Sequence, residues 1–564
     1  MNTADTSALS RREWLGRVSG PAIVGTLGAT ALVSGAAAPP APAIAHQDLG
    51  ARVYNIRDFG AQGDGTTLDT AAVQAAVDTC AAAKGGTVLV PAGVFVIGTV
   101  ELKSHVTLHL AAQATLLGSA DGKQYYAAAA IPLTGEHTMG DGNVGLLFAA
   151  NAENVTIEGE GTIDGQGAQF HSAVRGQPPP SGRGGNQRPH HVLFYKCTNL
   201  TVRDIFLQAC AYHSVRICVC THVKLDGLRI HSRVNGNNDG FHFISSQFVH
   251  VSNCEVQCQD DACALFGSCK FVTVTNCTFS TRWSVFRFGT GEAENITVTN
   301  CIIHGTYGCP IKLRCDSRSR FENILFSNLV MNGVTGPISI GLGEQRPRAA
   351  GAPPLTPGIV RNVSFHGIRA TVVKPVPLPD TSIGGSFNPG EIFSCIILNG
   401  ASDDGWIENV SFTDVHVVFP GGGTAGHAAV RDVPKIANEY FSIGVPPACG
   451  LYARRVRGLT LQNVRFETAT PDARPAVIFD HVCDAAINGL AATGEPQAES
   501  SLRFIASQEV LVTAGRILTP TAVAVRIEGG ASAGITIDGG DWSKAAKTIE
   551  LADGAMAAAV KLRA

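Results

Sequence analysis

The sequence has few charged and few aromatic residues. Asp, Glu, Lys and Arg make up 16% of its 564 residues, and the formal net charge is -3. A protein that binds nucleic acid concentrates Lys and Arg on one surface, because its partner is a polyanion. We therefore expect no nucleic-acid partner. Phe, Trp and Tyr make up only 7%, while 63 residues are glycine, a balance typical of a turn-rich all-β protein.

Two further absences narrow the class of protein. After residue 45 no apolar run is long enough to cross a bilayer, so we expect no membrane span in the mature chain. The 16 cysteines include no Cys-x-x-Cys pair, which disfavours a zinc-type metal cluster. In an exported protein some of these cysteines could form disulfides, and that possibility stays open.

The N-terminus resembles an export signal. A Ser-Arg-Arg-Glu-Trp-Leu run contains Arg11 and Arg12 and leads into Gly/Ala-rich residues 18–38 and a cleavage-like Ala-Ile-Ala at 43–45. This pattern is typical of the twin-arginine export signal. We expect residues 1–45 to be a signal peptide and the mature protein to be periplasmic or extracellular. An uncleaved membrane anchor is the alternative, although the stretch is short and rich in glycine for a spanning helix.

A short phrase recurs along the chain, consisting of Asn or a similar residue followed by alternating apolar and polar residues. Its copies begin at Asn154, Asn199, His222, Phe248, Phe271, Asn295, Asn323, Asn362, Asn409 and Gly458. From Asn199 to Asn323 the spacings are 23, 26, 23, 24 and 28 residues. Two-residue alternation predicts strands, and a repeat of this length predicts a solenoid. We therefore expect a parallel β-helix, in which each turn covers the apolar face of its neighbour.

The rest of the chain extends this solenoid. A helical pattern from Asp69 to Ala83 predicts an amphipathic helix that caps the open end. We expect residues 46–145 to form this cap and the first turns, residues 146–490 the main β-helix, and residues 491–564 a C-terminal extension or cap. Wider repeat spacings of 39, 47 and 49 residues after Asn323 predict inserted loops beside a groove.

Cysteines follow the same repeat. Five of them, Cys197, Cys220, Cys254, Cys277 and Cys301, are mostly 23 or 24 residues apart, and three follow an Asn. Equivalent positions on adjacent turns would stack. We expect both the thiols and the amides to form inward-facing ladders.

Two groups of carboxylates lie one repeat apart. Asn237-Asn238-Asp239-Gly240 is followed 21 residues after Asp239 by Asp260-Asp261. Since one turn has about that length, Asp239 should lie roughly one strand spacing, about 4.8 Å, from the pair. Three carboxylates on one face cannot all ionise cheaply, so at least one pKa should rise, as a general acid requires. Asp and Asn at such turns could instead cap backbone groups or bind calcium.

Several motifs resemble the polygalacturonases of glycoside hydrolase family 28. They are Asp58-Phe59-Gly60-Ala61, Val90-Pro91-Ala92-Gly93, Thr162-Ile163-Asp164-Gly165, Arg188-Pro189-His190 and Val202-Arg203-Asp204-Ile205, and the similarity runs discontinuously from about residue 53 to 490. The resemblance implies an all-β, single-stranded, right-handed parallel β-helix with a catalytic domain in residues 146–490. It also implies a polygalacturonase-like inverting hydrolase of a pectic or related uronate-containing polysaccharide, without a cofactor or metal. We expect a monomer with a polysaccharide or oligosaccharide partner.

The resemblance also implies roles for single residues. Asp260 matches the general acid, and Asp239 with Asp261 would hold and deprotonate the attacking water. Asn237 belongs to the same motif, in which Asn238 replaces the family's threonine. In the substrate-binding arginine-isoleucine-lysine motif Lys312 is kept, whereas the arginine is not.

Two residues of the family pattern are missing. No histidine lies near Trp283-Ser284-Val285, and Pro310 stands where the family has the arginine of the motif ending in Lys312. Arg314, Arg287 or Arg282 could compensate for that arginine, because a guanidinium binds a carboxylate with two hydrogen bonds. His242 could replace the missing histidine in the groove.

Two other functions remain open on the sequence alone. A polysaccharide lyase on the same fold would use calcium and an Arg or Lys base, and Lys312 and Arg314 keep that alternative open. A non-catalytic carbohydrate-binding β-helix would also account for the missing residues. The inserts around residues 120–145, 168–188, 341–360 and 374–404 could close one end of the groove, which would favour attack on chain ends.

Overall fold

A computed structural model describes residues 52–134, 140–172, 177–344, 356–381, 387–400, 405–437 and 440–563, within the compact unit Leu49–Ala564. The expected export signal, residues 1–45, lies outside the described residues. No helix among the described residues is long and apolar enough to cross a membrane.

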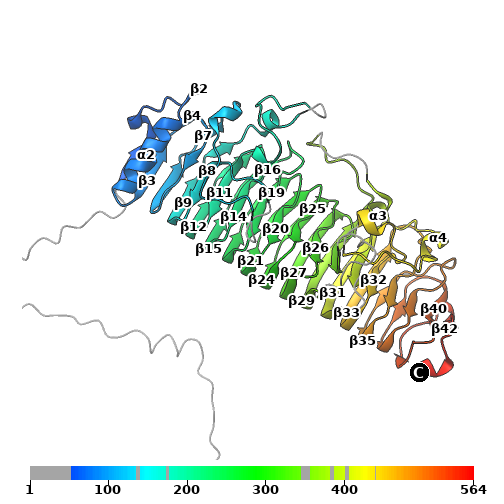
Figure 1. Ribbon diagram of the computed structural model, residues 1–564. Helices are drawn as coiled ribbons and strands as arrows, with labels where there is room; N and C mark the ends of the chain where they lie inside the picture. The colour runs from blue at the N-terminus through cyan, green and yellow to red at the C-terminus, as the bar shows by residue number, and fades with distance from the viewer. Residues whose placement is uncertain are drawn as a thin grey trace, which may run out of the picture. The chain divides into compact units, whose positions relative to one another are not determined.

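The unit is a right-handed parallel β-helix, as predicted, with strands stacked in parallel into a 28-stranded sheet and a 15-stranded sheet (Figure 1). The smaller sheet, sheet B below, contains β5 (Val100–Glu101), β8 (Gly145–Ala150), β11 (His190–Tyr195), β14 (Val215–Cys218), β17 (Phe241–Ile244), β20 (Cys263–Phe266), β23 (Phe286–Phe288), β26 (Ile311–Cys315), β28 (Ile338–Leu342), β30 (Ile396–Gly400), β32 (Leu451–Arg454), β34 (Val477–Asp480), β37 (Leu502–Ile505), β40 (Thr521–Glu528) and β42 (Ala545–Ala552).

The larger sheet consists of two ladders in its first half. One ladder contains β1 (Val53–Asn55), β3 (Gly86–Val90), β6 (Val106–Leu110), β9 (Glu153–Gly159), β12 (Thr198–Arg203), β15 (Thr221–Asp226), β18 (Gln247–Ser252), β21 (Cys269–Thr275) and β24 (Glu292–Thr299). The other contains β2 (Asp64–Leu68), β4 (Gly93–Ile97), β7 (Ala114–Gly118), β10 (Thr162–Asp164), β13 (Phe206–Gln208), β16 (Arg229–Ser232), β19 (Glu255–Cys258), β22 (Thr278–Thr281) and β25 (Ile302–Thr306).

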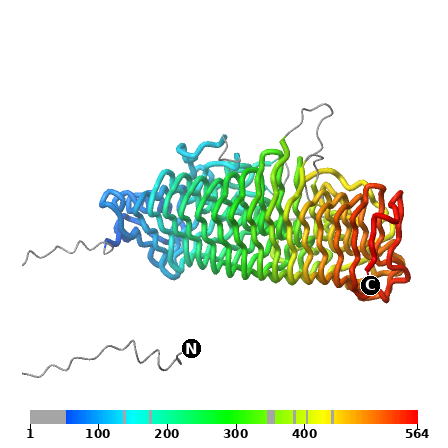
Figure 2. The backbone as a smooth tube through the Cα atoms, turned by 90° about the horizontal axis from the view of Figure 1, so that it is seen from below, coloured from blue at the N-terminus to red at the C-terminus, as the bar shows by residue number. Residues whose placement is uncertain are grey.

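The two ladders merge in longer strands. Both β24 and β25 pair with β27 (Arg320–Val334), which is followed by β29 (Ile359–Val372), β31 (Ile407–Phe419) and β33 (Val456–Thr468). The ladders then separate again into β35 (Cys483–Asn488), β38 (Gln508–Thr513), β41 (Ile535–Asp538) and β43 (Val560–Arg563), and into β36 (Ala491–Ala492) and β39 (Arg516–Ile517). Figure 2 shows the resulting continuous stack of turns. The C-terminal strands continue both sheets.

A helix covers the N-terminal end of the stack. α2 (Thr70–Ala82) lies within the predicted range and buries Val73, Ala76, Val77 and Cys80 against the first strands. The remaining α-helices are single turns in inserted loops: α3 (Pro389–Ile392), α4 (Ala425–Ala428) and α5 (Tyr440–Ile443). The main core is one continuous cluster of inward-facing side chains that extends from Ile56 to Ile537.

The recurrent Asn has a conformational cause. Asn199, Asn295 and Asn323 have φ values of 57°, 58° and 55°, in the left-handed region that Asn tolerates better than most residues. Their side-chain amides also stack between turns, and Asn323 Nδ2 donates to Asn295 Oδ1 over 3.1 Å. Phe248 and Phe271 occupy the same position in two turns, and their rings stack instead, with centroids 4.9 Å apart.

The cysteine prediction is half right. The five ladder thiols are buried, and all 16 cysteines are free in the structure. The amides of Asn253, Asn276 and Asn300, however, are exposed, so the prediction of inward amides was wrong. Each of these Asn residues has a positive φ next to the buried Cys. The chain bends there, and this bend turns the amide outward.

Most of the long insertions precede strands of sheet B. Residues 119–144, 165–189, 373–395 and 420–450 connect the larger sheet to β8, β11, β30 and β32. In Figure 1 the described parts of these insertions emerge along the same long edge of the stack, near β8 and β16 and around α3 and α4. This edge is where the predicted carboxylates lie.

Candidate active site

The predicted carboxylates lie on adjacent turns. Asp239 lies two residues before β17, and Asp261 lies two residues before β20, which pairs with β17 in parallel. Asp260 precedes Asp261 in the chain. Two backbone hydrogen bonds join the turns, from Gly240 N to Asp261 O and from Asp260 N to Asn238 O, both 3.0 Å long. The repeat length therefore brings the two motifs together as expected.

Asn238 holds the backbone of this loop in place. Its side chain is fully buried. The oxygen accepts hydrogen bonds from the backbone N–H of Val234 and Asn235, and the nitrogen donates to the carbonyls of Cys210 and Tyr212. All four hydrogen-bonding positions of the amide are used, which a threonine hydroxyl could not match. The substitution of the family's threonine is thus structural.

Two histidines lie beside Asp239. Its side chain is buried, His242 Nδ1 lies 2.7 Å from Oδ2, and His213 Nε2 lies 3.7 Å from Oδ1. The two imidazole rings are stacked, with centroids 4.3 Å apart. Burial lowers the pKa of His242 to about 4, so the ring is neutral and its Nδ1–H donates to the carboxylate. His242 is buried behind Asp239, whereas the sequence suggested a position in the groove.

Burial and neighbouring carboxylates raise the pKa of Asp260 and of Asp239. The pKa of Asp260 lies well above its usual value because of burial and because of the charges of Asp239 and Asp261. Burial also raises the pKa of Asp239 strongly, with contributions from Asp261 and Asp141. The site therefore keeps a proton on this group of carboxylates at a pH where isolated aspartates are ionised. This is what a general acid beside a general base requires.

Asn237 connects Asp260 to an insertion. Its Nδ2 donates to Asp260 Oδ2 over 3.4 Å, and its Oδ1 accepts from Arg188 Nη2 over 3.0 Å. Arg188 comes from the insertion 165–189 and lies over the Tyr212 ring. A surface hollow beside Asn237 is lined by Phe170, His171, Pro179 and Arg188, among others. Arg188 belongs to an Arg-Pro-His motif of the sequence, yet nothing in the sequence linked it to Asn237.

Cationic side chains lie on the next two turns. Arg287 on β23 pairs in register with Lys312 on β26, and Arg314 lies two residues further along the outer face. Burial lowers the pKa of Lys312 to about 7, and the charges of Arg314 and Arg287 add to this effect. Burial and Arg287 lower the pKa of Arg314 to about 9. These cations repel one another, and a bound anion would relieve that repulsion.

A tryptophan lies in the segment where the family's histidine is missing. Trp283 has the Lys312 ammonium 5.8 Å and the Arg282 guanidinium 4.6 Å from its ring centroid. Arg282 also lies over Phe387 and forms an ion pair with the buried Glu391, at 3.0 Å. Arg282 is therefore held by the insertion 373–395 and is the least available of the three arginines for substrate.

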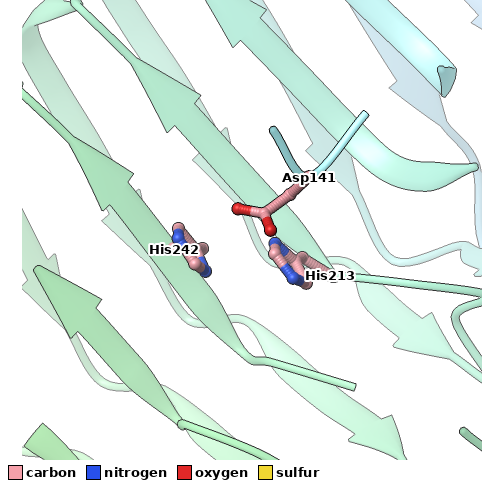
Figure 3. Close-up of side chains that lie close together, drawn as sticks. All are labelled: Asp141, His213 and His242. Atoms are coloured by element: carbon pink, nitrogen blue, oxygen red, sulfur yellow. The ribbon is translucent and has the colours of Figure 1, made fainter. Parts of the chain in front are cut away.

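One group of side chains has the composition of a metal site. Asp141, His213 and His242 each offer a ligand atom within 4.8 Å of the other two, and Figure 3 shows them together. A metal bound by two imidazoles lies near the plane of both rings, whereas these rings are stacked only 7° from parallel. Arg216 Nη2, a cation, lies 3.6 Å from the Asp141 carboxylate. This geometry suits a hydrogen-bonding network around Asp239, and we assign no metal to the group.

Comparison with known proteins identifies the family. The sequence profile of glycosyl hydrolases family 28 matches residues 80–379, more than half of the chain. The chain belongs to this family. The chain is also similar to a polygalacturonase from Malus domestica, with 25% identity over 344 residues that cover 58% of this chain and 70% of the relative. The protein is thus a polygalacturonase-like glycoside hydrolase.

Solved structures show the same fold. A hyperthermoactive exopolygalacturonase from Thermotoga maritima matches with a TM-score of 0.54 and 20% identity, over 74% of this chain and 92% of that chain. A family 28 exopolygalacturonase from Yersinia enterocolitica also matches with a TM-score of 0.54 and 20% identity, over 77% and 78%. At 20% identity these two structures show that this chain has the same fold, and they show nothing about its substrate.

Proposed function

We propose that the protein is an inverting glycoside hydrolase that cleaves a pectic or related uronate-containing polysaccharide without a cofactor. The proposal rests on the arrangement of Asp239, Asp260 and Asp261 on two adjacent turns. Inversion needs one carboxylic acid to protonate the leaving oxygen and one carboxylate to activate water on the opposite face of the sugar.

Asp260 is the better placed of these residues to act as the acid. Its side chain is partly exposed, its pKa is raised by burial and by two neighbouring carboxylates, and the side-chain hydrogen bond that it accepts from Asn237 is long, at 3.4 Å. A carboxyl group with few hydrogen bonds to its ionised form keeps its proton. Asp260 can therefore donate this proton to the leaving group.

Asp239 is the better placed to act as the base. The short hydrogen bond from His242 favours its ionised form over that of Asp260. Asp261, adjacent to Asp260 in the chain and partly exposed, would help to hold the attacking water. The two groups then exchange protonation states in each turnover, and activity should follow a bell-shaped pH profile at acidic to near-neutral pH.

The cations supply a subsite for a uronate carboxylate. Arg287, Lys312 and Arg314 lie on the outer face of sheet B, on the two turns after Asp260 and Asp261. A substrate carboxylate bound there would pair with Lys312 and reduce its repulsion with Arg314. This placement favours a charged sugar over a neutral one.

The test compares wild-type protein with Asp260→Asn on polygalacturonate and rhamnogalacturonan. Asp484→Asn, an exposed substitution far along the stack, serves as the control. We expect reducing ends to appear with wild type and with the control, and activity to fall by several orders of magnitude in Asp260→Asn while substrate binding persists. Equal turnover by wild type and Asp260→Asn would refute the assignment.

A calcium-dependent lyase is the second candidate, because Lys312 has a pKa of about 7 and could act as a base at neutral pH. Lyase action forms an unsaturated product that absorbs in the ultraviolet, and it stops when a chelator removes calcium. We expect reducing ends without such absorbance, unchanged by chelator.

Export by the twin-arginine route is a separate proposal, supported by Arg11 and Arg12. Replacing both arginines with lysine should retain the protein in the cytoplasm of its host. Unchanged export of that variant would contradict the proposal.

A further inference from the structure

We propose that this site accepts chain ends or short oligosaccharides and excludes the interior of a long polysaccharide. The inference rests on the proposed function and deepens it. It comes from two segments that cover the outer face of sheet B on both sides of the carboxylates. We call residues 127–131 and 140–143 the N-terminal cover and residues 433–437 the C-terminal cover.

The N-terminal cover lies on the turns that precede Asp239. Ala128 and Ile131 are buried in a small apolar cluster with Phe148, Leu193, Tyr195 and Cys218, which point outward from sheet B, and the cluster continues to Ile244, Ala264 and Phe266 on β17 and β20. This cluster is separate from the main core. The outer face of β8, β11 and β14 is thus packed under protein and cannot also bind sugar.

Hydrogen bonds hold this cover at the turn next to Asp239. Arg216, on the outer face of β14, donates to Gly142 O over 2.8 Å and pairs with Asp141. Its neighbour in register on β17 is His242, which binds Asp239. Asn186, from the insertion 165–189, donates to Gly140 O. The cover therefore ends one strand spacing before the carboxylates.

The C-terminal cover closes the other side. A Cβ atom at Gly341, on the outer face of β28, would lie 2.8 Å from Ala437 Cα, so the two backbones are in contact. Asn399 on β30 donates to the carbonyls of Pro434 and Ile436, and Arg454 on β32 donates to Val433 O. Ala437 N donates in turn to Glu344 O over 2.8 Å.

In the described part of the chain, β17, β20, β23 and β26 are the strands of sheet B that lie between the two covers. Three strand spacings span about 14 Å. This stretch carries Asp260, Asp261, Lys312 and Arg314, and Asn237 beside it is exposed. A polymer that continued along the stack beyond β17 or beyond β26 would meet a cover within one strand spacing. The substrate must therefore enter end-on, and only a few sugar units fit.

The test follows product length during hydrolysis of polygalacturonate by wild-type protein. We expect one short product of fixed length from the earliest time points, and little loss of viscosity while reducing ends accumulate. A ladder of long oligosaccharides with rapid loss of viscosity would overturn the inference alone. No hydrolysis of any uronate-containing polymer would overturn the proposed function and this inference with it.

A matched pair of variants tests the N-terminal cover itself. Ile131→Asp places a charge in the apolar cluster and should loosen the cover, whereas Leu133→Asp changes an exposed residue of the same segment. We expect the fraction of products longer than a dimer to rise several-fold in Ile131→Asp and to stay at the wild-type level in Leu133→Asp. Product patterns identical to wild type in a folded Ile131→Asp variant would contradict the role of the cover.

Discussion

The contact between His242 and Asp239 gives the most specific prediction. His242→Phe keeps a ring of similar volume that can still stack on His213 and Phe266, but it removes the Nδ1–H that lies 2.7 Å from Asp239 Oδ2. His242→Asn removes the ring yet can place an amide N–H near the Nδ1 position. The two variants therefore separate the hydrogen bond from the packing.

The magnitude follows from the charge on the acceptor. A hydrogen bond to a charged group contributes about 1.5–3 kcal/mol. Since 1.36 kcal/mol corresponds to one pKa unit, its loss should raise the pKa of Asp239 by about 1–2 units. The base is active only when ionised, so the acidic limb of the kcat/KM profile should move to higher pH by that amount. Below this limb the rate should fall about 10- to 100-fold.

The assay is a full pH profile of kcat/KM for wild type, His242→Phe and His242→Asn on one soluble uronate oligosaccharide. We expect the shift of the acidic limb in His242→Phe and a return most of the way to wild type in His242→Asn. If His242→Phe instead raised KM without moving the acidic limb, His242 would be a substrate contact and the reasoning would be refuted.

Three further predictions follow. Lys312→Met should raise KM for a charged substrate about tenfold below pH 7, where Lys312 is protonated. The reason is that a hydrogen bond between charged groups contributes about 1.5–3 kcal/mol. The KM for a neutral oligosaccharide, measured in parallel, should not change. The wild-type KM should also rise as pH passes about 7, because Lys312 then loses its charge, and a KM independent of pH from 6 to 8 would contradict this. Arg474→Met should destabilise the fold by about 3–5 kcal/mol, because it leaves the buried Asp472 without its ion-pair partner and removes the hydrogen bonds to Phe393 O and Pro446 O. Thermal unfolding measures the loss of stability. An unchanged Tm would contradict the prediction.

The repeating part of the fold is the part that the sequence predicts. Alternation of apolar and polar residues defines each strand, and the left-handed Asn at the start of many copies defines where the chain turns. Because adjacent turns stack in register, a spacing of 21 residues was enough to place Asp239 beside Asp260 and Asp261. The direction of the Asn253, Asn276 and Asn300 amides was predicted wrongly, since two-residue alternation does not hold through a bend.

The contacts that the insertions make could not be predicted in this way. The insertions have no period, and their contacts depend on where the ends of each loop are held. Arg188, Asp141 and Glu391 reach the neighbourhood of the site from insertions, and they lie 51, 98 and 152 residues from Asp239 along the chain. Residues 127–131 and 433–437, which cover sheet B, also belong to insertions, so their contacts could not be predicted either. The sequence therefore predicts the reaction class, whereas the shape of the site follows only from the three-dimensional structure.

The central claim is inverting hydrolysis by paired aspartates, and proton NMR of the wild-type reaction tests it most directly. The spectrum reports the anomeric configuration of the reducing end before mutarotation, and it also detects the vinyl proton of a lyase product. We predict that the first product carries the anomeric configuration opposite to that of the cleaved bond, with no vinyl signal. A first product with retained configuration, or a vinyl signal, would contradict the roles assigned to Asp239, Asp260 and Asp261.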